Sequence, residues 1–312
     1  MNSVVKYQVD PVVRTQLDFK IDQIPKFWFG GDPFKTRFFD ALSLTFPEGE
    51  RFFIESVRLF RDRIQDPELQ AKVKDFIRQE AQHGIAHDRM NQEMIKQGMP
   101  VEKFTQMLRT RFQGVLENQT AEYCIALTAA SEHLTALMAE CFFGEKETMQ
   151  EVHPYVRALL AWHSIEEMEH RDVAFDVMKQ VAEVDEKTRK KALVIASGMM
   201  LLFNSYRTNE MLKQDGFNVS QRVKLFARGL PWFFGKKGKL TKMKSQYLDW
   251  FKSDFHPSQH PIIQQYDVWM NTLAQTQDPI QAGEAFWAHA RESHRIHSIA
   301  KPSTTDNPKI GD

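Results

Sequence analysis

Apolar side chains recur with the helical period of 3.6 residues along most of this chain. Phe52, Phe53, Val57 and Phe60 form one such stripe, and later stripes stop where glycine or proline occurs. No segment alternates with a period of two residues for long enough to suggest a sheet. The pattern predicts four long helical regions, the third made of a crossover piece followed by a helix: residues 47–64, 67–97, 101–143 and 153–184.

Two short links and one longer crossover join the four predicted helices. This connectivity is typical of a ferritin-like four-helix bundle. We therefore predict an all-α fold in which such a bundle carries an additional C-terminal helical region. The predicted organisation has four parts: an irregular lead-in over 1–46, the bundle over 47–184, a basic helical extension packed on the bundle over 185–300, and a disordered tail over 301–312.

Charge is balanced over the whole chain but not along it. The 41 Lys and Arg equal the 41 Asp and Glu, which excludes a chain-wide electrostatic grip on nucleic acid. Residues 187–245 carry 14 Lys and Arg against Glu210 and Asp215, a local net charge of +12. We expect this block to stay exposed. Its aromatic and basic stretch, residues 231–239, fits either peripheral membrane contact or packing of the aromatics against the bundle.

Signals for export or for a membrane span are missing from the sequence. The first residues contain no apolar h-region, and the longest apolar run, residues 192–203, is too short to cross a bilayer. Cys124 and Cys141 lack the spacing of a thiolate zinc site and cannot form a disulfide framework. We expect a cytoplasmic protein, membrane-associated only if residues 187–245 touch lipid, that does not bind nucleic acid and dimerises through bundle faces.

A Glu-x-x-His step occurs in two of the predicted helices. At spacings of three, four and seven residues, side chains share one face of a helix. The residues on these two faces are Glu80, His83 and His87 in the second helix, and His163, Glu167 and His170 in the fourth. Two such faces in one bundle indicate a metal site.

The other two helices each offer a glutamate for the same site. Glu132 lies in an apolar stretch of the third helix, where Glu122 and Glu140 are its rivals, and Glu50 follows Pro47 in the first helix. Glu48 and Glu55 are the alternatives to Glu50. One glutamate from each of two helices, with a Glu-x-x-His from each of the others, is the ligand set of a carboxylate-bridged dinuclear centre.

Four carboxylates would neutralise the four charges of two divalent metal ions in an apolar core. The predicted ligands are Glu50, Glu80, His83, Glu132, His163, Glu167 and His170. Zinc fits these ligand types, but bridging glutamates in a bundle favour iron, with manganese or a mixed iron–manganese pair as alternatives.

His163 and His87 exceed the six ligands that the bundle pattern requires. His163 is predicted as an added ligand, and His87 as a residue that supports a ligand or lines the cavity. Glu166, next to Glu167, is a candidate for the same supporting role. His133 points about 100° away from Glu132 on the helix and is not expected to be a ligand.

With these residues in place, the sequence resembles the bacterial family described as predicted metal-dependent hydrolase, which implies a ferritin-like fold. The resemblance covers nearly the whole chain and rests on five motifs: Leu42-Ser43-x-x-Phe46-Pro47-x-Gly49-Glu50-x-Phe52-Phe53, Gln79-Glu80-x-x-His83-x-x-x-His87, Glu132-His133-x-Thr135-Ala136, Trp162-His163-x-x-Glu166-Glu167-x-Glu169-His170 and Phe255-His256-Pro257. The fourth motif is also similar, more distantly, to the di-iron arylamine N-oxygenases, and this likeness implies that His163 binds iron.

Three functions remain open at this stage. The leading hypothesis is an oxygen-activating di-iron oxidase or oxygenase that acts on a small or lipid-like organic substrate. No flavin, nicotinamide or iron–sulfur signature is present, so its electrons would come from an external donor. The alternatives are a two-metal hydrolase, in which the metal ions activate water, and a non-enzymatic iron-binding protein.

Overall fold

Helices dominate the structure, a computed structural model that describes residues 7–236 and 238–290. Within these residues there is no strand, and one isolated bridge joins Phe29 to Val152. The predicted all-α class is confirmed, whereas the ferritin-like arrangement stays a prediction. The helices are α1 (Pro33–Ser43), α2 (Phe46–Arg58), α3 (Pro67–Lys96), α4 (Val101–Asn118), α5 (Ala121–Met138), α6 (Lys146–Met149), α7 (Pro154–His170), α8 (Val173–Asp176), α9 (Glu186–Gln214), α10 (Val219–Phe234), α11 (Lys239–Lys242), α12 (Lys244–Asp249), α13 (Tyr266–Thr276) and α14 (Pro279–Ala288).

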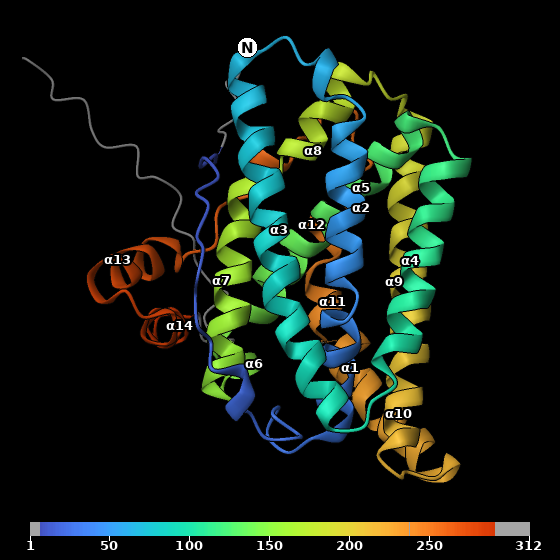
Figure 1. The fold of residues 1–312 in the computed structure, drawn as a ribbon, viewed down its shortest axis with the longest axis vertical. Helices are drawn as coiled ribbons and strands as arrows, with labels where there is room; N and C mark the ends of the chain where they lie inside the picture. Colours follow the sequence, from blue (N-terminus) through green and yellow to red (C-terminus); the bar gives the residue numbers. More distant parts are fainter. Residues whose placement is uncertain (1–6, 237, 291–312) are drawn as a thin grey trace, which may run out of the picture.

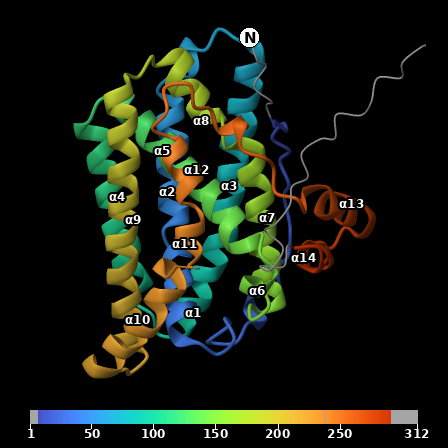
Figure 2. The same ribbon diagram turned by 180° about the vertical axis from the view of Figure 1, so that it is seen from behind.

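Six long helices run along the long axis of the molecule: α2, α3, α4, α5, α7 and α9 (Figure 1). On the opposite side, α11 and α12 follow one another lengthwise along the back of this group (Figure 2). The pair α13–α14 packs against α7, where Gly283 lies so close to Ala158 that an added Cβ would come within 2.5 Å of its Cα. The long helices therefore enclose an interior that residues from distant parts of the chain can share.

The helices begin where the capping signals of the sequence indicate. Asp66 accepts a hydrogen bond from the backbone of Glu68, and Pro67 is the first residue of α3. Asp185 likewise caps α9 by accepting hydrogen bonds from the backbone of Lys187 and Thr188. These caps fix the residues at which α3 and α9 begin.

Two expectations about the helices are wrong. Residues 33–43, inside the lead-in expected to be irregular, form α1, because Asp32 caps the backbone of Phe34 and Lys35 and Pro33 starts the helix. The fourth helix does not continue unbroken to residue 184 but turns directly after His170, and α8 follows. The apolar stripe carries no signal of this break. The predicted tail over 301–312 lies outside the described residues.

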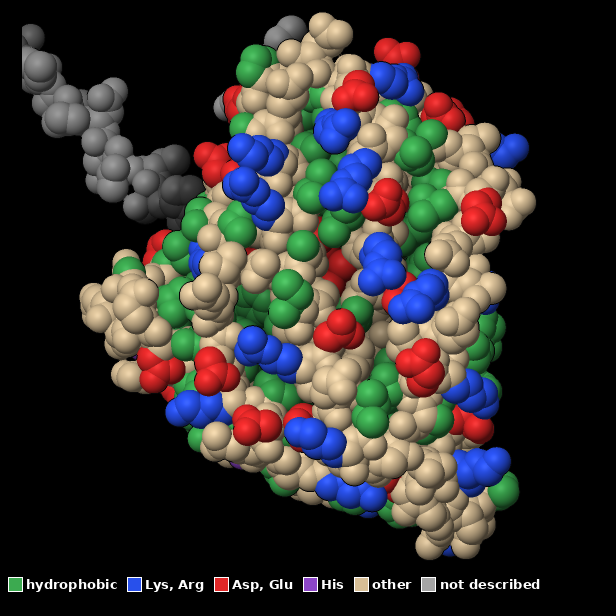
Figure 3. All heavy atoms as spheres, viewed as in Figure 1, with side chains coloured by type: hydrophobic (Ala, Val, Ile, Leu, Met, Phe, Trp, Pro, Cys, Tyr) green, Lys and Arg blue, Asp and Glu red, His purple; other side chains and the backbone are tan. Residues whose placement is uncertain are grey.

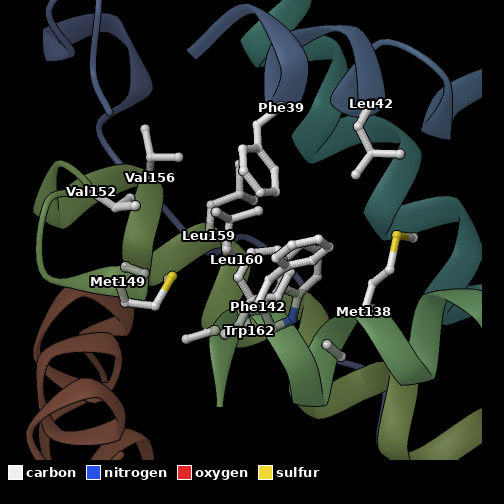
Figure 4. Close-up of a cluster of buried hydrophobic side chains, with 14 of the residues drawn as sticks. Phe39, Leu42, Met138, Phe142, Met149, Val152, Val156, Leu159, Leu160 and Trp162 are labelled. Carbon is white, nitrogen blue, oxygen red and sulfur yellow. The ribbon is translucent and has the colours of Figure 1, made fainter. Parts of the chain in front are cut away.

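Aromatic and aliphatic side chains from α1, α5, α6, α7 and the π-helical turn η3 (Ala139–Phe143) meet in one buried cluster (Figure 4). The end of α10 joins it, with Phe233 centred 4.2 Å from Phe38 and Trp232 stacked on Phe142 at 5.7 Å. These aromatics of the 231–239 stretch therefore pack against the core, as one of the two interpretations expects.

The expectation that the whole basic block is exposed is wrong. Arg189 is buried between Glu186 and the backbone carbonyl of Trp250, and Arg207 and Lys239 are buried too. On the face that includes α2, α3 and α4, Lys and Arg side chains are interspersed with Asp and Glu (Figure 3). Because Arg189, Arg207 and Lys239 are buried, part of the positive charge of residues 187–245 lies inside the fold.

Across the described residues, we find no helix whose length and hydropathy would allow it to cross a membrane.

Candidate metal centre

The structure brings all seven predicted ligands together in the interior. They come from four helices that are separate in sequence, and each is at most 6% exposed. They are Glu50 on α2, Glu80 and His83 on α3, Glu132 on α5, and His163, Glu167 and His170 on α7. Carboxylates and imidazoles that cannot reach solvent thus face one another.

Within this cluster, three overlapping groups have donor atoms that lie within 4.8 Å of one another: Glu50, His83 and His163; Glu80, His83 and His170; and Glu132, Glu167 and His170. His170 Nε2 is 3.2 Å from Glu80 Oε1 and 3.3 Å from Glu132 Oε2. His83 Nδ1 is 4.0 Å from oxygens of both Glu50 and Glu80. Because His83 and His170 each belong to two groups, the arrangement suits two neighbouring ions.

Several atoms that point into the cluster have no hydrogen-bond partner among the described residues. They are both carboxylate oxygens of Glu50 and Glu132, Oε1 of Glu80, Nδ1 of His83 and Nε2 of His170. An unsatisfied buried polar atom costs stability, and a buried polar group normally has a partner. Seven such atoms in one buried cluster fit bound metal ions, because cations would satisfy them together.

Burial shifts the pKa values of the acids and bases in the cluster in the directions expected for a site without metal. Desolvation, reinforced by neighbouring carboxylates, raises the pKa values of Glu50, Glu80 and Glu132 well above the ordinary range. Burial also lowers the pKa of His83, with neighbouring histidines adding to the shift. Burial opposes ionisation of Glu167 as well, yet hydrogen bonds with histidines outweigh it and lower its pKa to about 2.

Two buried side chains hold the histidines of the Glu-x-x-His steps in orientation. Gln79 Oε1 accepts from His170 Nδ1 at 3.1 Å, which leaves the lone pair on Nε2, the atom that faces the carboxylates. Glu166 Oε2 lies 3.1 Å from His83 Nε2, so that Nδ1 faces the centre. Burial raises the pKa of Glu166 to about 8, although Arg14 opposes the shift. Glu166 thus contacts the candidate ligand His83, and its supporting role stays a prediction.

A chain of hydrogen bonds leads from Glu167 to Ser43. Glu167 Oε1 is 2.9 Å from His163 Nε2, and His163 Nδ1 is 2.7 Å from His87 Nε2. His87 Nδ1 lies 2.8 Å from Ser43 Oγ, a group that can donate or accept. His87 therefore contacts a predicted ligand and belongs to none of the three candidate ligand groups, consistent with a supporting role.

Arg14 closes the centre from the N-terminal segment. Its guanidinium lies 3.0 Å from Glu166 Oε1 and 2.7 Å from Glu169 Oε1, and it is 9% exposed. Gln79 also donates to Glu169, at 2.7 Å. The acids next to Glu167 in sequence thus have cationic or amide partners of their own and do not enter the ligand cluster.

The alternatives to the predicted ligands lie elsewhere. Glu48 pairs with Arg109 at 2.8 Å, and Glu55 pairs with Arg58 at 2.8 Å. Glu122 belongs to none of the three ligand groups, and Glu140 accepts a hydrogen bond from Gln246. His133 stacks on Trp250 at 5.0 Å, on another side of α5 from Glu132.

A largely apolar cavity of about 770 Å³ lies beside the centre, between α2, α4, α5 and α9. Glu50 and Thr135 belong to its wall, and Thr135 donates to Glu167 Oε2 at 2.6 Å. Phe46 separates the cavity from the histidines, with its ring 4.5 Å from that of His87. The volume falls within the range of about 300–1,000 Å³ that is usual for small-molecule sites.

Sequence reasoning assigned no role to Arg14, Gln79, Thr135 or Ser43. Gln79, Thr135 and Ser43 are part of the motifs that carry the family resemblance, but the spacing of ligands on a helix does not reveal such supporting contacts. Arg14 lies in a segment without helical periodicity, and nothing in the sequence connects it to Glu166, 152 residues away.

The family model described as "Predicted metal-dependent hydrolase" matches residues 13–261, which include every residue of the cluster and Arg14. No curated protein and no solved structure matches the chain. The description of the family and the buried cluster of carboxylates and imidazoles both indicate metal binding.

Proposed function

The chain belongs to the family of predicted metal-dependent hydrolases, and we propose that it holds two divalent metal ions in the buried cluster and hydrolyses an organic substrate bound in the adjacent cavity. The observation that carries this proposal is the convergence of unpartnered carboxylate and imidazole atoms next to the cavity wall that contains Glu50. We propose a ferritin-like arrangement of α2, α3, α5 and α7 as the scaffold.

Glu50, Glu80, Glu132 and Glu167 would hold the ions together with His83, His163 and His170. Two divalent ions in such a site supply charge that lowers the pKa of water and stabilises a developing oxyanion. The four carboxylates balance that charge, and the imidazoles add neutral nitrogen ligands. Glu50 is the ligand through which the centre borders the cavity, so the substrate would approach from that side.

The remaining residues orient the ligands and handle protons. Gln79 keeps the lone pair of His170 on Nε2, and Thr135 fixes Glu167 Oε2 by donating a hydrogen bond. When His163 Nε2 serves as a ligand, its proton resides on Nδ1 and is donated to His87 Nε2. His87 would then donate from Nδ1 to Ser43 Oγ, so the hydrogen bonds from His163 to Ser43 would persist, while the one between His163 Nε2 and Glu167 would give way to the metal ion.

Aromatic side chains keep bulk water away from the centre. The ring of Phe76 lies 5.1 Å from His170, and that of Trp162 lies 4.9 Å from His83. Exclusion of water strengthens each electrostatic interaction within the site. A buried centre of this kind admits a reactant through the cavity rather than directly from the surface.

The ligand chemistry also favours a second candidate, an oxygen-dependent oxidase or oxygenase. Four glutamates with two Glu-x-x-His steps in a helical bundle form the donor set of di-iron and di-manganese carboxylate centres. Iron is the metal we propose first, with manganese or a mixed pair as alternatives. In this case the protein would need electrons from an external donor. A protein that only binds iron would have the same ligands but no turnover.

One experiment separates these functions. Protein purified from its native host is analysed for metals, then stripped and reloaded anaerobically with ferrous, manganous or zinc ions. Each form is assayed with aryl and alkyl esters in nitrogen and in air, while oxygen is followed with an electrode. Metal-dependent hydrolysis that is equal in nitrogen and air supports the proposal. Turnover that occurs only in air and only with a chemical reductant supplied as electron donor, with oxygen consumed, supports the oxidase instead. The absence of both activities under these conditions rejects both functions for ester substrates.

A further inference from the structure

Arg207, on α9, is a buried cation on the wall of the cavity. Its side chain is 5% exposed, and its Nη2 donates to Thr45 Oγ1 at 2.7 Å. Among the described residues, no carboxylate lies within ion-pair distance of the guanidinium, and its Nε has no acceptor. Arg207 therefore presents unused hydrogen-bond donors and an uncompensated charge at the cavity.

Other buried arginines of the described chain have their charge or their donors satisfied. Arg14 pairs with Glu169, Arg37 with Asp40, and Arg189 with Glu186, while Arg171 donates to three backbone carbonyls. A buried charge without a partner is costly, and burial accordingly lowers the pKa of Arg207 to about 10. Arg207 differs from these arginines, and it lies at a cavity that leaves room for a bound ligand.

The cavity is long and has two different ends. Along α9 its wall extends from Thr188 to Arg207, a stretch of about 28 Å at the rise of an α-helix. Asp185 and Glu183 line the end that is far from Arg207. Most of the wall between the two ends is aromatic, aliphatic or methionine side chain. Lys191 lies at the far end as well, but it is exposed to solvent. An elongated apolar molecule fits this shape, and the buried charge of Arg207 favours its anionic end at the Arg207 end of the cavity.

The position of Arg207 relative to the metal centre is set by α2. Thr45, its hydrogen-bond partner, immediately precedes α2, and Glu50 follows five residues later, about 7.5 Å along the helix. Both residues line the cavity. An anion held at Arg207 and Thr45 would thus lie in the same cavity as the candidate ligand Glu50, which is about one and a half helical turns further along α2.

We propose that the cavity binds amphipathic carboxylates, with the carboxylate at Arg207 and Thr45 and the apolar chain extended along α9. The planar guanidinium suits a carboxylate, because its two Nη–H groups can donate to both carboxylate oxygens at once. A single negative charge balances the single uncompensated cation. As an assignment of substrate class this proposal rests on the proposed function, whereas the binding itself rests on Arg207 and the cavity alone.

The test measures binding of decanoate, 1-decanol and decylammonium by titration calorimetry to the full chain, in metal-free and metal-loaded form. We expect wild-type protein to prefer decanoate in both forms. Arg207→Gln should weaken decanoate binding at least about 30-fold and leave decanol within about twofold. Arg207→Lys should keep part of the preference, because it keeps the charge but not the planar donors.

Arg111→Gln is the matched control, since Arg111 also lines the cavity but is exposed to solvent. Its decanoate affinity should change less than about fivefold. Thr45→Val provides a second variant that leaves the charge in place and should weaken decanoate binding by a smaller factor than Arg207→Gln. Equal affinity for decanoate and decanol in wild type would overturn the proposal. So would decanoate binding that needs metal and is unchanged in Arg207→Gln, because the carboxylate would then be a metal ligand.

The two proposals fail in different ways. If the metal-free protein binds decanoate through Arg207 but no metal-loaded form has activity, the binding site stands and the proposed function falls. If metal-dependent hydrolysis is found but neutral and anionic esters are turned over equally in wild type and in Arg207→Gln, the function stands and the substrate class falls.

Discussion

Glu48 and Glu50 lie two residues apart on α2, both buried, and their carboxylates have opposite surroundings. Glu48 lies within ion-pair distance of Arg109 and Arg51, at 2.8 and 3.5 Å, while Glu50 has no hydrogen-bond partner for either oxygen among the described residues. Gly84 on α3 leaves space for Glu50, because an added Cβ would lie 3.4 Å from its Oε2. One glutamate is thus satisfied by the protein, and the other is available to a cation.

This difference gives the first prediction. Glu50→Gln removes a candidate ligand and should leave at most one metal ion per chain, whereas Glu48→Gln should keep two. The two variants change the same residue type at the same depth on one helix, so each is the control for the other. Metal content is measured by elemental analysis after anaerobic loading. The assignment is wrong if Glu48→Gln loses metal while Glu50→Gln keeps both ions.

Metal binding should release protons. Burial and neighbouring carboxylates raise the pKa values of Glu50, Glu80 and Glu132. The metal-free protein therefore keeps protons on these carboxyls at pH values above 4.5, the ordinary pKa of a glutamate. A metal ion must displace them, and apparent affinity should rise about tenfold per pH unit for each proton released. Calorimetry in buffers of different ionisation enthalpy counts these protons. An affinity that does not rise with pH at any point above pH 4.5 contradicts the prediction.

His87 should tune metal affinity without being a ligand. It holds His163 through a hydrogen bond of 2.7 Å, and loss of such a supporting contact typically costs about 10–100-fold in metal affinity. His87→Phe should therefore weaken binding by this factor while two ions still bind at saturation. His133→Phe, at a buried histidine outside the cluster, is the control and should change affinity less than about threefold. A loss of stoichiometry in His87→Phe would instead identify His87 as a ligand.

Replacement of Arg14 should destabilise the fold. Arg14→Met leaves the buried carboxylate of Glu169 without its cation, and removing one partner of a buried ion pair costs about 3–5 kcal/mol. Denaturant unfolding of metal-free protein measures the change. Arg58→Met breaks the half-exposed pair with Glu55 and should cost at most about 1 kcal/mol. Equal effects of the two replacements would show that the Arg14 pair is not buried in solution.

Arg207→Leu should stabilise the ligand-free protein. The pKa of Arg207 is lowered to about 10, below its value of 12.5 in the unfolded chain, so the cost of the buried charge is fully present below pH 10 and is relieved only above it. Removing the charge should add about 1 kcal/mol or more and raise Tm by about 2–4 °C, equally at pH 6 and pH 9. Arg111→Leu should leave Tm nearly unchanged. A lower Tm for Arg207→Leu would mean that the hydrogen bond to Thr45 outweighs the cost of the buried charge.

The candidate ligands could be predicted because their spacing is a local property of a helix. A residue three, four or seven positions from another shares its face in any α-helix, so Glu80 and His83, or Glu167 and His170, had to meet on one surface. The same periodicity predicted which face of α3 and of α7 is buried. Glu132 and Glu50 required only that four helices enclose one interior.

The rest of the site depends on contacts between distant segments. Arg14 reaches Glu166 across 152 residues, and Arg207 reaches Thr45 across 162, and no repeat or capping signal marks either pair. Arg207 was counted in sequence as one more cation of a basic block, because composition does not separate a buried charge from an exposed one. The turn after His170 was missed for a related reason, since the apolar stripe continues beyond it.

The residues that meet at the candidate metal centre, including Arg14 and the acids of α7, are made at widely separated times during synthesis. The chain emerges from its N-terminus, so Arg14, Glu50, Glu80 and His83 exist long before His163, Glu167 and His170 are made. A metal ion that meets the growing chain finds an incomplete set of ligands without the helices that bury it, and binds weakly. We therefore expect the metal to be acquired after α7 is complete, with selection between metals made by the assembled cage rather than by the nascent polypeptide.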